Sequence, residues 1–197
     1  MPFDLVLESI ATLLSPLEMT WGFCGGWAID LFLNRFTRSH KDVDIAILRR
    51  DQHLLFAFLR QRGWALEQAV DGKLHPFEED EFLRLPVHAI WCRKAEARPD
   101  FLEVLLNESD RDQFVFRRDP RVRCRLNEAF VLAPSGLPIL APEIALLYKS
   151  NALSSPENGL DFQWALPQLN AQRRRWLAEA LGMLSLTHPW LNDLVDS

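Results

Sequence analysis

The chain has 197 residues, 48% of them apolar and 25% charged, which suits one compact domain or a core with a smaller cap. A net charge of −5 argues against a nucleic-acid binder, and three widely spaced cysteines predict reduced thiols in the cytoplasm. We expect no membrane span, since no run reaches the roughly 18 apolar residues required, and no secretory leader, since MPFDLVLESI lacks a basic start.

Hydrophobic periodicity predicts an α+β core followed by a helical segment. In chain order, the core should begin with a helix at 3–14, a strand at 21–24, a helix at 27–34, a strand at 43–48 and a helix at 52–62 capped by Asp51. Strands should follow at 64–70, 87–92 and 100–106, then a strand pair within 114–125 and two short strands around a turn at 134–136. From Pro142, a typical first helical residue, the period is helical, with Asn170 as a cap. We therefore predict two parts, 1–141 and 142–197.

Two aspartates at a predicted strand give the first functional sign. Asp42 and Asp44 stand two apart in HKDVDIAIL, so on a strand their side chains should share one face, about 7 Å apart. Such a pair is costly unless a cation lies between the carboxylates. Mg²⁺, which takes oxygen ligands, is the simplest such cation. The alternative is a strand-edge pair that faces water.

A third carboxylate and a glycine pair extend this pattern. Glu103 lies in the middle of an apolar strand, where glutamate is rare, and joins the aspartates if the two strands are neighbours. Otherwise Glu103 faces solvent or pairs with an arginine. Gly25 and Gly26, between a strand and a helix, can present backbone N–H groups to a phosphate. The simpler explanation of a lone glycine pair is a tight turn.

Arginines raise two further hypotheses. Arg38, just before the aspartates, either contacts phosphate from its loop or pairs with a nearby acid. Five arginines gather in the segment 117–125, and the last three, Arg121, Arg123 and Arg125, alternate as on one strand face. A polyanionic acceptor such as tRNA would suit this cluster, but a solvated strand with local ion pairs suits the acidic chain better. Nucleic acid is therefore not expected as a partner.

One long segment resembles a known group of enzymes. GGWAIDLFLNRFTRSHKDVDIAI is similar to the nucleotidyltransferase superfamily related to DNA polymerase β, most of all its aminoglycoside 2''-adenylyltransferase-like branch. The stretches FLEVLLNESD, LPILAPEIALLYKS and DFQWALPQL resemble that branch as well, so the resemblance covers most of the chain. It implies a mixed β-sheet flanked by helices, with a C-terminal helical segment that faces the nucleotide cleft.

The resemblance also implies an activity and its acidic residues. A nucleoside monophosphate, in the first place AMP from ATP, would move to a hydroxyl of a small acceptor such as an aminoglycoside-like antibiotic. Asp42 and Asp44 match the metal-binding pair. Glu103 matches the third acidic position, which ligates a metal or takes the proton of the attacking hydroxyl. Two Mg²⁺ ions would be held by these three carboxylates.

Further positions of the resemblance concern the nucleotide. Gly25 and Gly26 match the turn that contacts phosphate, and Lys149 matches a basic position that faces nucleotide or acceptor. The chain departs from the pattern in PENGLDF, where Glu157 and Asn158 replace a Lys-Asp pair found in many relatives. If that lysine neutralises phosphate, turnover or acceptor choice differs here.

Two other functions stay open at this point. A toxin-type nucleotidyltransferase would use the same acids to modify a protein or tRNA. A non-catalytic nucleotide-binding or interaction module would bind without transfer. The three costly carboxylates argue against the module, because a protein without catalysis gains nothing from keeping them.

Overall fold

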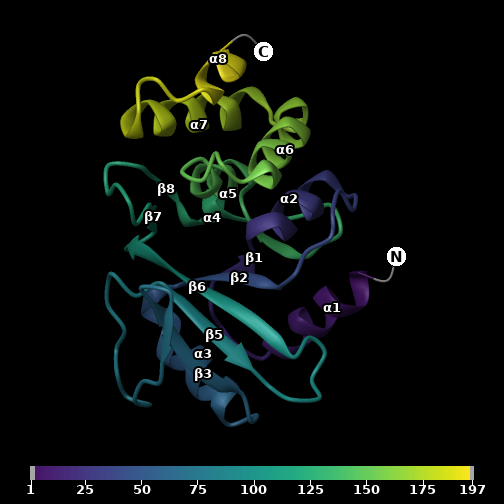
Figure 1. The fold of residues 1–197 in the computed structure, drawn as a ribbon, viewed down its shortest axis with the longest axis vertical. Coiled ribbons are helices and arrows are strands. Elements are labelled where there is room, and N and C mark those ends of the chain that lie inside the picture. The colour runs from purple at the N-terminus through teal and green to yellow at the C-terminus, as the bar shows by residue number, and fades with distance from the viewer. Residues whose placement is uncertain (1–2, 196–197) are drawn as a thin grey trace.

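The computed structural model describes residues 3–195 and consists of a mixed sheet with the C-terminal helices gathered at one end (Figure 1). The strands are β1 Trp21–Phe23, β2 Asp44–Leu48, β3 Ala65–Val70, β4 Lys73–His75, β5 Ala89–Arg93, β6 Phe101–Asp110, β7 Gln113–Val115, β8 Arg123–Arg125, β9 Phe130–Leu132 and β10 Pro138–Leu140. The helices are α1 Phe3–Leu14, α2 Gly25–Leu33, α3 Gln52–Arg60, α4 Leu126–Ala129, α5 Pro142–Lys149, α6 Pro156–Ala165, α7 Ala171–Leu184 and α8 Trp190–Val195, with 3₁₀ turns η1 Arg49–Asp51 and η2 Leu166–Gln168.

The sheet confirms the predicted α+β class. Its strand order is β4-β3-β5-β6-β2-β1-β10-β9, and β7 and β8 extend from β6 as an antiparallel pair. The sheet is mixed, because β2 pairs in parallel with β6 but antiparallel with β1. β2 is buried from Ile45 to Leu48, as expected for a central strand with both faces covered. The short strands predicted around 134–136 are β9 and β10.

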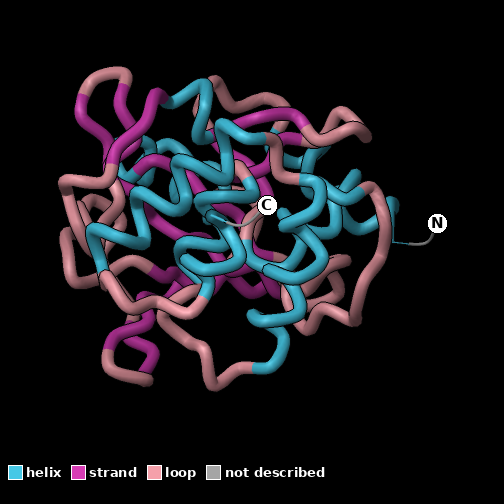
Figure 2. Tube along the Cα trace, turned by 90° about the horizontal axis from the view of Figure 1, so that it is seen from above, coloured by secondary structure: helices cyan, strands magenta, loops and turns pink. Residues whose placement is uncertain are grey.

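The C-terminal helices complete one core with the sheet. Helix α2 contacts both α5 and α6, and Leu177 and Leu181 of α7 belong to the same buried cluster as Ile45 and Val104 of the sheet. Seen from above in Figure 2, these helices cover the strands. The last strand ends at Leu140, next to the predicted boundary at 141, and the division into two parts stays a prediction. None of the helices within residues 3–195 is long and apolar enough to cross a membrane.

Three local predictions need correction. β2 begins at Asp44, where its pairing with Glu103 begins, so Asp42 lies in the preceding loop and does not alternate with Asp44 on a strand. Gly25 and Gly26 form the first residues of α2 and are not a separate turn. Asp51 makes no side-chain cap, because η1 already leads the backbone into α3.

Other local predictions concern the ends of elements. Asn170 caps α7 as predicted, since its side chain accepts a hydrogen bond from the backbone N–H of Arg173 at 2.9 Å. Arg121 lies outside β8, so the three arginines do not share one strand face. Arg121 and Arg123 instead pair with Asp119 and Asp110, at 2.6 and 3.1 Å, which fits the solvated alternative.

Candidate active site

Asp44 and Glu103 lie opposite each other at the start of the parallel pair β2 and β6. Backbone hydrogen bonds fix this register: Glu103 N donates to the carbonyl of Val43 at 2.9 Å, and Cys24 N donates to that of Asp44 at 2.9 Å. The indole N–H of Trp91, on β5, donates to Glu103 Oε1 at 3.1 Å and orients that carboxylate. The prediction that these two strands are neighbours is confirmed.

The charge of this pair is poorly compensated. Burial, and then the negative charge of Glu103, raise the pKa of Asp44 to about 7. Burial also raises the pKa of Glu103, although hydrogen bonds from Trp91 and Asp44 act in the opposite direction. Asp42 adds further negative charge to both carboxyl groups. A cation bound between them would remove this repulsion.

The donor set fits Mg²⁺ that arrives with a phosphate. Within residues 3–195, no three His, Cys, Asp or Glu side chains are arranged as a ready-made metal cage. Mg²⁺, however, is usually held by one or two carboxylates and completes its shell with water and substrate phosphate oxygens. Asp44 and Glu103, with Asp42 nearby, offer oxygen donors only. The metal role of Asp42, Asp44 and Glu103 stays a prediction.

The two glycines at the start of α2 allow a close approach to this pair. Gly25 has φ +62, and a Cβ there would lie 2.3 Å from Asp44 Oδ2. A Cβ on Gly26 would lie 2.3 Å from Arg38 Nη2 and 2.5 Å from His40 Cε1. Glycine is therefore required at both positions, and the N-terminus of a nine-residue helix opens beside the carboxylates.

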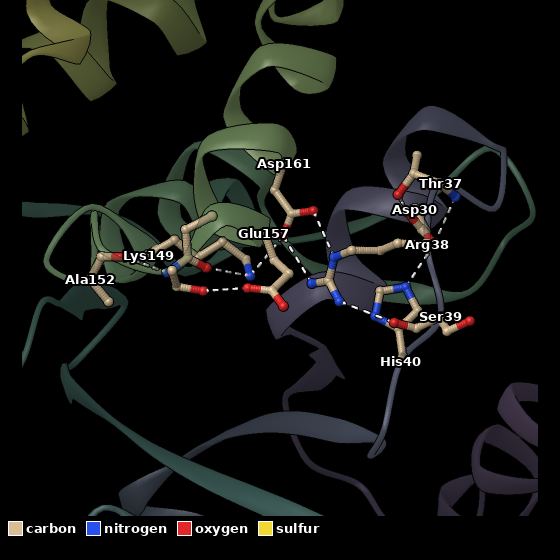
Figure 3. Close-up of polar contacts among 11 residues, drawn as sticks. Asp30, Thr37, Arg38, Ser39, His40, Lys149, Ala152, Glu157 and Asp161 are labelled. Atoms are coloured by element: carbon tan, nitrogen blue, oxygen red, sulfur yellow. Dashed lines mark hydrogen bonds and ion pairs between the residues drawn. The ribbon is translucent and has the colours of Figure 1, made fainter.

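Arg38 and Lys149 meet at one buried acid, Asp161 of α6 (Figure 3). Arg38 donates from Nε and Nη2 to the two oxygens of Asp161, both at 3.1 Å, and Lys149 Nζ lies 2.8 Å from Oδ2. Lys149 also donates to Asn158 Oδ1 at 3.3 Å. Asp161 is 0% exposed. Of the two alternatives for Arg38, pairing with an acid is the one found, and its contact with phosphate stays a prediction.

A second buried acid, Asp30 of α2, holds the loop that carries Arg38 and Asp42. It accepts hydrogen bonds from the backbone N–H of Thr37, at 3.2 Å, and from the Thr37 hydroxyl, and it lies 2.7 Å from His40 Nε2. The His40 ring packs on Trp27, with centroids 4.2 Å apart, and the indole N–H of Trp27 donates to the carbonyl of Asp42. Sequence reasoning missed Asp30, although an acid in the apolar stretch WAIDLFLN was a usable signal.

The site is divided into two compartments that share Gly25 and Lys149. The outer one has a volume of about 430 Å³ and is mostly polar; it is lined by Gly25, Gly26, Arg38, Ser39, His40, Lys41, Asp42, Asp44, Lys149, Ser155, Glu157 and Asn158. The inner one has a volume of about 200 Å³; its polar lining includes Glu103, His88, Asn107, Arg117, Arg118, Tyr148 and Lys149. The carboxylate pair thus separates them, with Asp44 on the outer side and Glu103 on the inner side.

A comparison with known families agrees with this architecture. The sequence model of the aminoglycoside-2''-adenylyltransferase family matches residues 6–98, just under half of the chain. That range contains the glycine pair, the loop with Arg38 and both aspartates, but not Glu103 or the C-terminal helices. No curated protein matches the sequence.

Solved structures match over a longer range. The enzyme ANT(2'')-Ia in complex with adenylyl-2''-tobramycin has a TM-score of 0.64 at 15% identity, covering 94% of this chain and 100% of that one. The lincosamide adenylyltransferase LnuA with bound lincomycin has a TM-score of 0.57 at 17% identity, covering 82% and 94%. An antigenic nucleotidyltransferase-like protein from Paracoccidioides brasiliensis has a TM-score of 0.52 at 18% identity, covering 98% and 91%.

These matches confirm the resemblance and the fold predicted from the sequence. At such low identity the solved structures establish a shared nucleotidyltransferase-type architecture and not a shared substrate. The family match and the structures together support an adenylyltransferase-like enzyme.

Proposed function

We propose that the chain is a metal-dependent nucleotidyltransferase that moves AMP from ATP to a hydroxyl of a small acceptor. The observation that carries the proposal is the Asp44–Glu103 pair, which lies between a polar compartment with glycines and cations and a smaller second compartment. This arrangement suits a triphosphate on one side of the acids and an acceptor hydroxyl on the other.

In this proposal the residues of the outer compartment hold the nucleotide. The N-terminus of α2 at Gly25 and Gly26 offers backbone N–H groups to the phosphates. Arg38 and Lys149 line the same compartment and neutralise phosphate charge. When bound with the nucleotide at Asp42, Asp44 and Glu103, Mg²⁺ supplies neutralisation of developing negative charge and activation of the attacking oxygen; we expect two ions.

Glu103 is the carboxylate placed to accept the proton of the acceptor hydroxyl. It lines the inner compartment, and hydrogen bonds from Trp91 and Asp44 favour its ionised form. Its raised pKa, caused by burial, makes it a stronger base than an exposed glutamate. Most of the acceleration then comes from positioning and charge neutralisation, as in other phosphoryl-transfer sites.

The acceptor is the open part of the proposal. The similar structures carry adenylyl-2''-tobramycin and lincomycin, so hydroxyls of antibiotics are among the first to test. Modification of tRNA, the toxin-type alternative, gains no support from the arginine cluster, because Arg121 and Arg123 are engaged in local ion pairs.

The proposal predicts nucleotide binding that depends on a divalent metal. Without metal, the uncompensated acids repel the triphosphate, so the Kd for ATP in excess chelator should be at least about tenfold higher than in Mg²⁺. Calorimetry measures this difference. Labelled ATP, incubated with small hydroxylated acceptors, tRNA and protein extract, should then transfer label to a small molecule. Equal affinity with and without chelator, or no binding at all, would contradict the proposal.

The departure at Glu157 leads to a second prediction. Glu157 is exposed, lines the outer compartment and accepts a hydrogen bond from the Ser155 hydroxyl at 2.6 Å, so its charge faces the proposed triphosphate. Glu157→Lys should lower the Kd for Mg²⁺-ATP by about three- to tenfold, less at high salt because the site is open to solvent. Glu157→Gln should give a smaller gain. Glu179→Lys, an equal charge change on exposed α7, should have no effect; an equal gain there would refute a local role.

A further inference from the structure

Two arginines of the inner compartment lack an acidic partner. Arg117 and Arg118 follow β7 and line the compartment beside Glu103. Among the described residues, no carboxylate lies within ion-pair distance of either guanidinium. The nearest acid that acts on Arg117 is Glu108, and its Oε1 is already held by Arg49 Nε at 2.6 Å. Arg117 is half-buried and Arg118 is exposed, so Arg117 in particular lacks the acid that a half-buried arginine normally has.

The same two side chains are fixed in place by Tyr148 of α5. The guanidinium carbons of Arg117 and Arg118 lie 5.6 and 5.4 Å from the centre of the Tyr148 ring. Arg118 Nη1 donates to the carbonyl of Tyr148 at 2.9 Å, and the Tyr148 hydroxyl donates to Asn107 Oδ1 at 2.9 Å. Both side chains therefore contact Tyr148, and among residues 3–195 the one hydrogen bond of their guanidinium groups is the bond from Arg118 Nη1.

Among the side chains that line the inner compartment, the cationic ones outnumber the acidic one. Burial lowers the pKa of His88, and the positive charges of Arg117, Arg118 and Arg49 lower it further. His88 is therefore uncharged and contributes nothing to the charge of the compartment. Lys149 lies 2.8 Å from Asp161, a carboxylate that it shares with Arg38. Glu103 is the one acid among the residues that line this compartment, and the proposed function uses it as the base.

We propose that the inner compartment binds an acceptor that carries an oxyanion group, a carboxylate or a phosphate, beside its reactive hydroxyl, with Arg117 and Arg118 holding that group. The inference rests on the proposed function, because that function is what makes the ligand of this compartment an acceptor. It favours a small anionic polyol over a polycationic aminoglycoside, because several ammonium groups would face two unpaired guanidinium groups. The volume of about 200 Å³ also suits a small molecule, since sites for drug-sized ligands span about 300–1,000 Å³.

The test uses one polyol scaffold with different charges. Gluconate, glucose 6-phosphate, glucose and glucosamine are titrated against the full chain without nucleotide, with binding followed by NMR. The two anionic compounds should bind at least about tenfold more tightly than glucosamine, and comparing them distinguishes a carboxylate site from a phosphate site. Arg117→Gln with Arg118→Gln should abolish the preference and leave the Kd for Mg²⁺-ATP unchanged.

A matched control removes two charges elsewhere. Arg62→Gln with Arg175→Gln should keep the preference; both residues are exposed, Arg62 in the turn after α3 and Arg175 on α7. The inference is overturned if glucosamine binds as tightly as gluconate, if the preference survives in the Arg117 and Arg118 double variant, or if that variant instead weakens ATP binding. If the double variant does not fold, the two single variants take its place, each expected to lose part of the preference.

Failure of the proposed function gives a different result. It would appear as absent Mg²⁺-ATP binding in the unmodified chain, whereas the anion preference is measured without nucleotide and is decided independently.

Discussion

Asp44→Asn should reduce nucleotidyl transfer by at least about a thousandfold, because charge neutralisation by a metal held at this site is worth several kcal/mol in the transition state. Asparagine keeps the size and shape of the side chain but removes the negative charge that lies opposite Glu103 and lines the outer compartment. Single-turnover transfer from labelled ATP, at saturating Mg²⁺, measures the loss.

The same substitution should leave the metal-free protein folded and, above neutral pH, more stable. The pKa of Asp44 is raised to about 7 in the folded protein, against about 3.9 in an unfolded chain. The folded state therefore holds this proton more tightly, so the stability it contributes is full below about pH 4 and is lost as the pH rises through about 7. Thermal melts in chelator should show Asp44→Asn above the unmodified protein at pH 8, by on the order of 1–3 kcal/mol, and converging with it near pH 4.

Another Asp-x-Asp sequence in the chain supplies the control. Asp112 follows β6 in an exposed turn with Asp110, so Asp112→Asn should change neither transfer nor the pH profile. A destabilised Asp44→Asn protein that still binds Mg²⁺-ATP and transfers AMP at the normal rate would show that Asp44 has a structural role alone.

Asp161→Asn should cost about 3–5 kcal/mol of unfolding free energy, since it leaves the charges of Arg38 and Lys149 without their shared acid. Asp161 is completely buried and accepts three charged hydrogen bonds or ion-pair contacts, so water cannot replace the lost carboxylate. For a chain of this size the melting temperature should fall by roughly 6–15 °C. Thermal or urea unfolding measures the change.

An exposed arginine–aspartate pair is the comparison for this variant. Asp119 and Arg121 are 2.6 Å apart at the surface, and Asp119→Asn should lower the unfolding free energy far less than Asp161→Asn does. Equal losses of unfolding free energy in the two variants would contradict this prediction. They would show that burial does not strengthen the Asp161 contacts and that Arg38 and Lys149 find other partners.

The pairing of two carboxylates could be predicted from the sequence, because each is an acid in a strand that is otherwise apolar. Asp44 and Glu103 are acids in apolar strands, and such exceptions are conspicuous in a single sequence. Their direct pairing needed only that two predicted strands be neighbours, which β2 and β6 are. The strand predicted at 43–48 begins at Asp44, and Asp42, which we expected to share a strand face with Asp44, lies in the preceding loop.

The contacts of the cations could not be predicted in the same way. Arg38 and Asp161 lie 123 positions apart, and no periodicity relates them. Arg117 and Arg118 belonged to a visible cluster, yet the sequence did not show that they line the same compartment as Glu103 while Arg121 and Arg123 stay in local pairs. Such placement depends on how the C-terminal helices pack on the sheet, which is a long-range property.

The joining of Arg38 and Lys149 at Asp161 has a consequence for synthesis on the ribosome. The proposed metal-binding carboxylates Asp42, Asp44 and Glu103 have all been translated once the chain reaches residue 103. Lys149, which lines the outer compartment, and its partner Asp161 come later, from α5 and α6. A nascent chain that stops before Pro142 carries the repelling acids without these partners. Under the proposed function, the outer compartment therefore cannot assemble until most of the protein has left the exit tunnel, and an incomplete chain should not consume nucleotide.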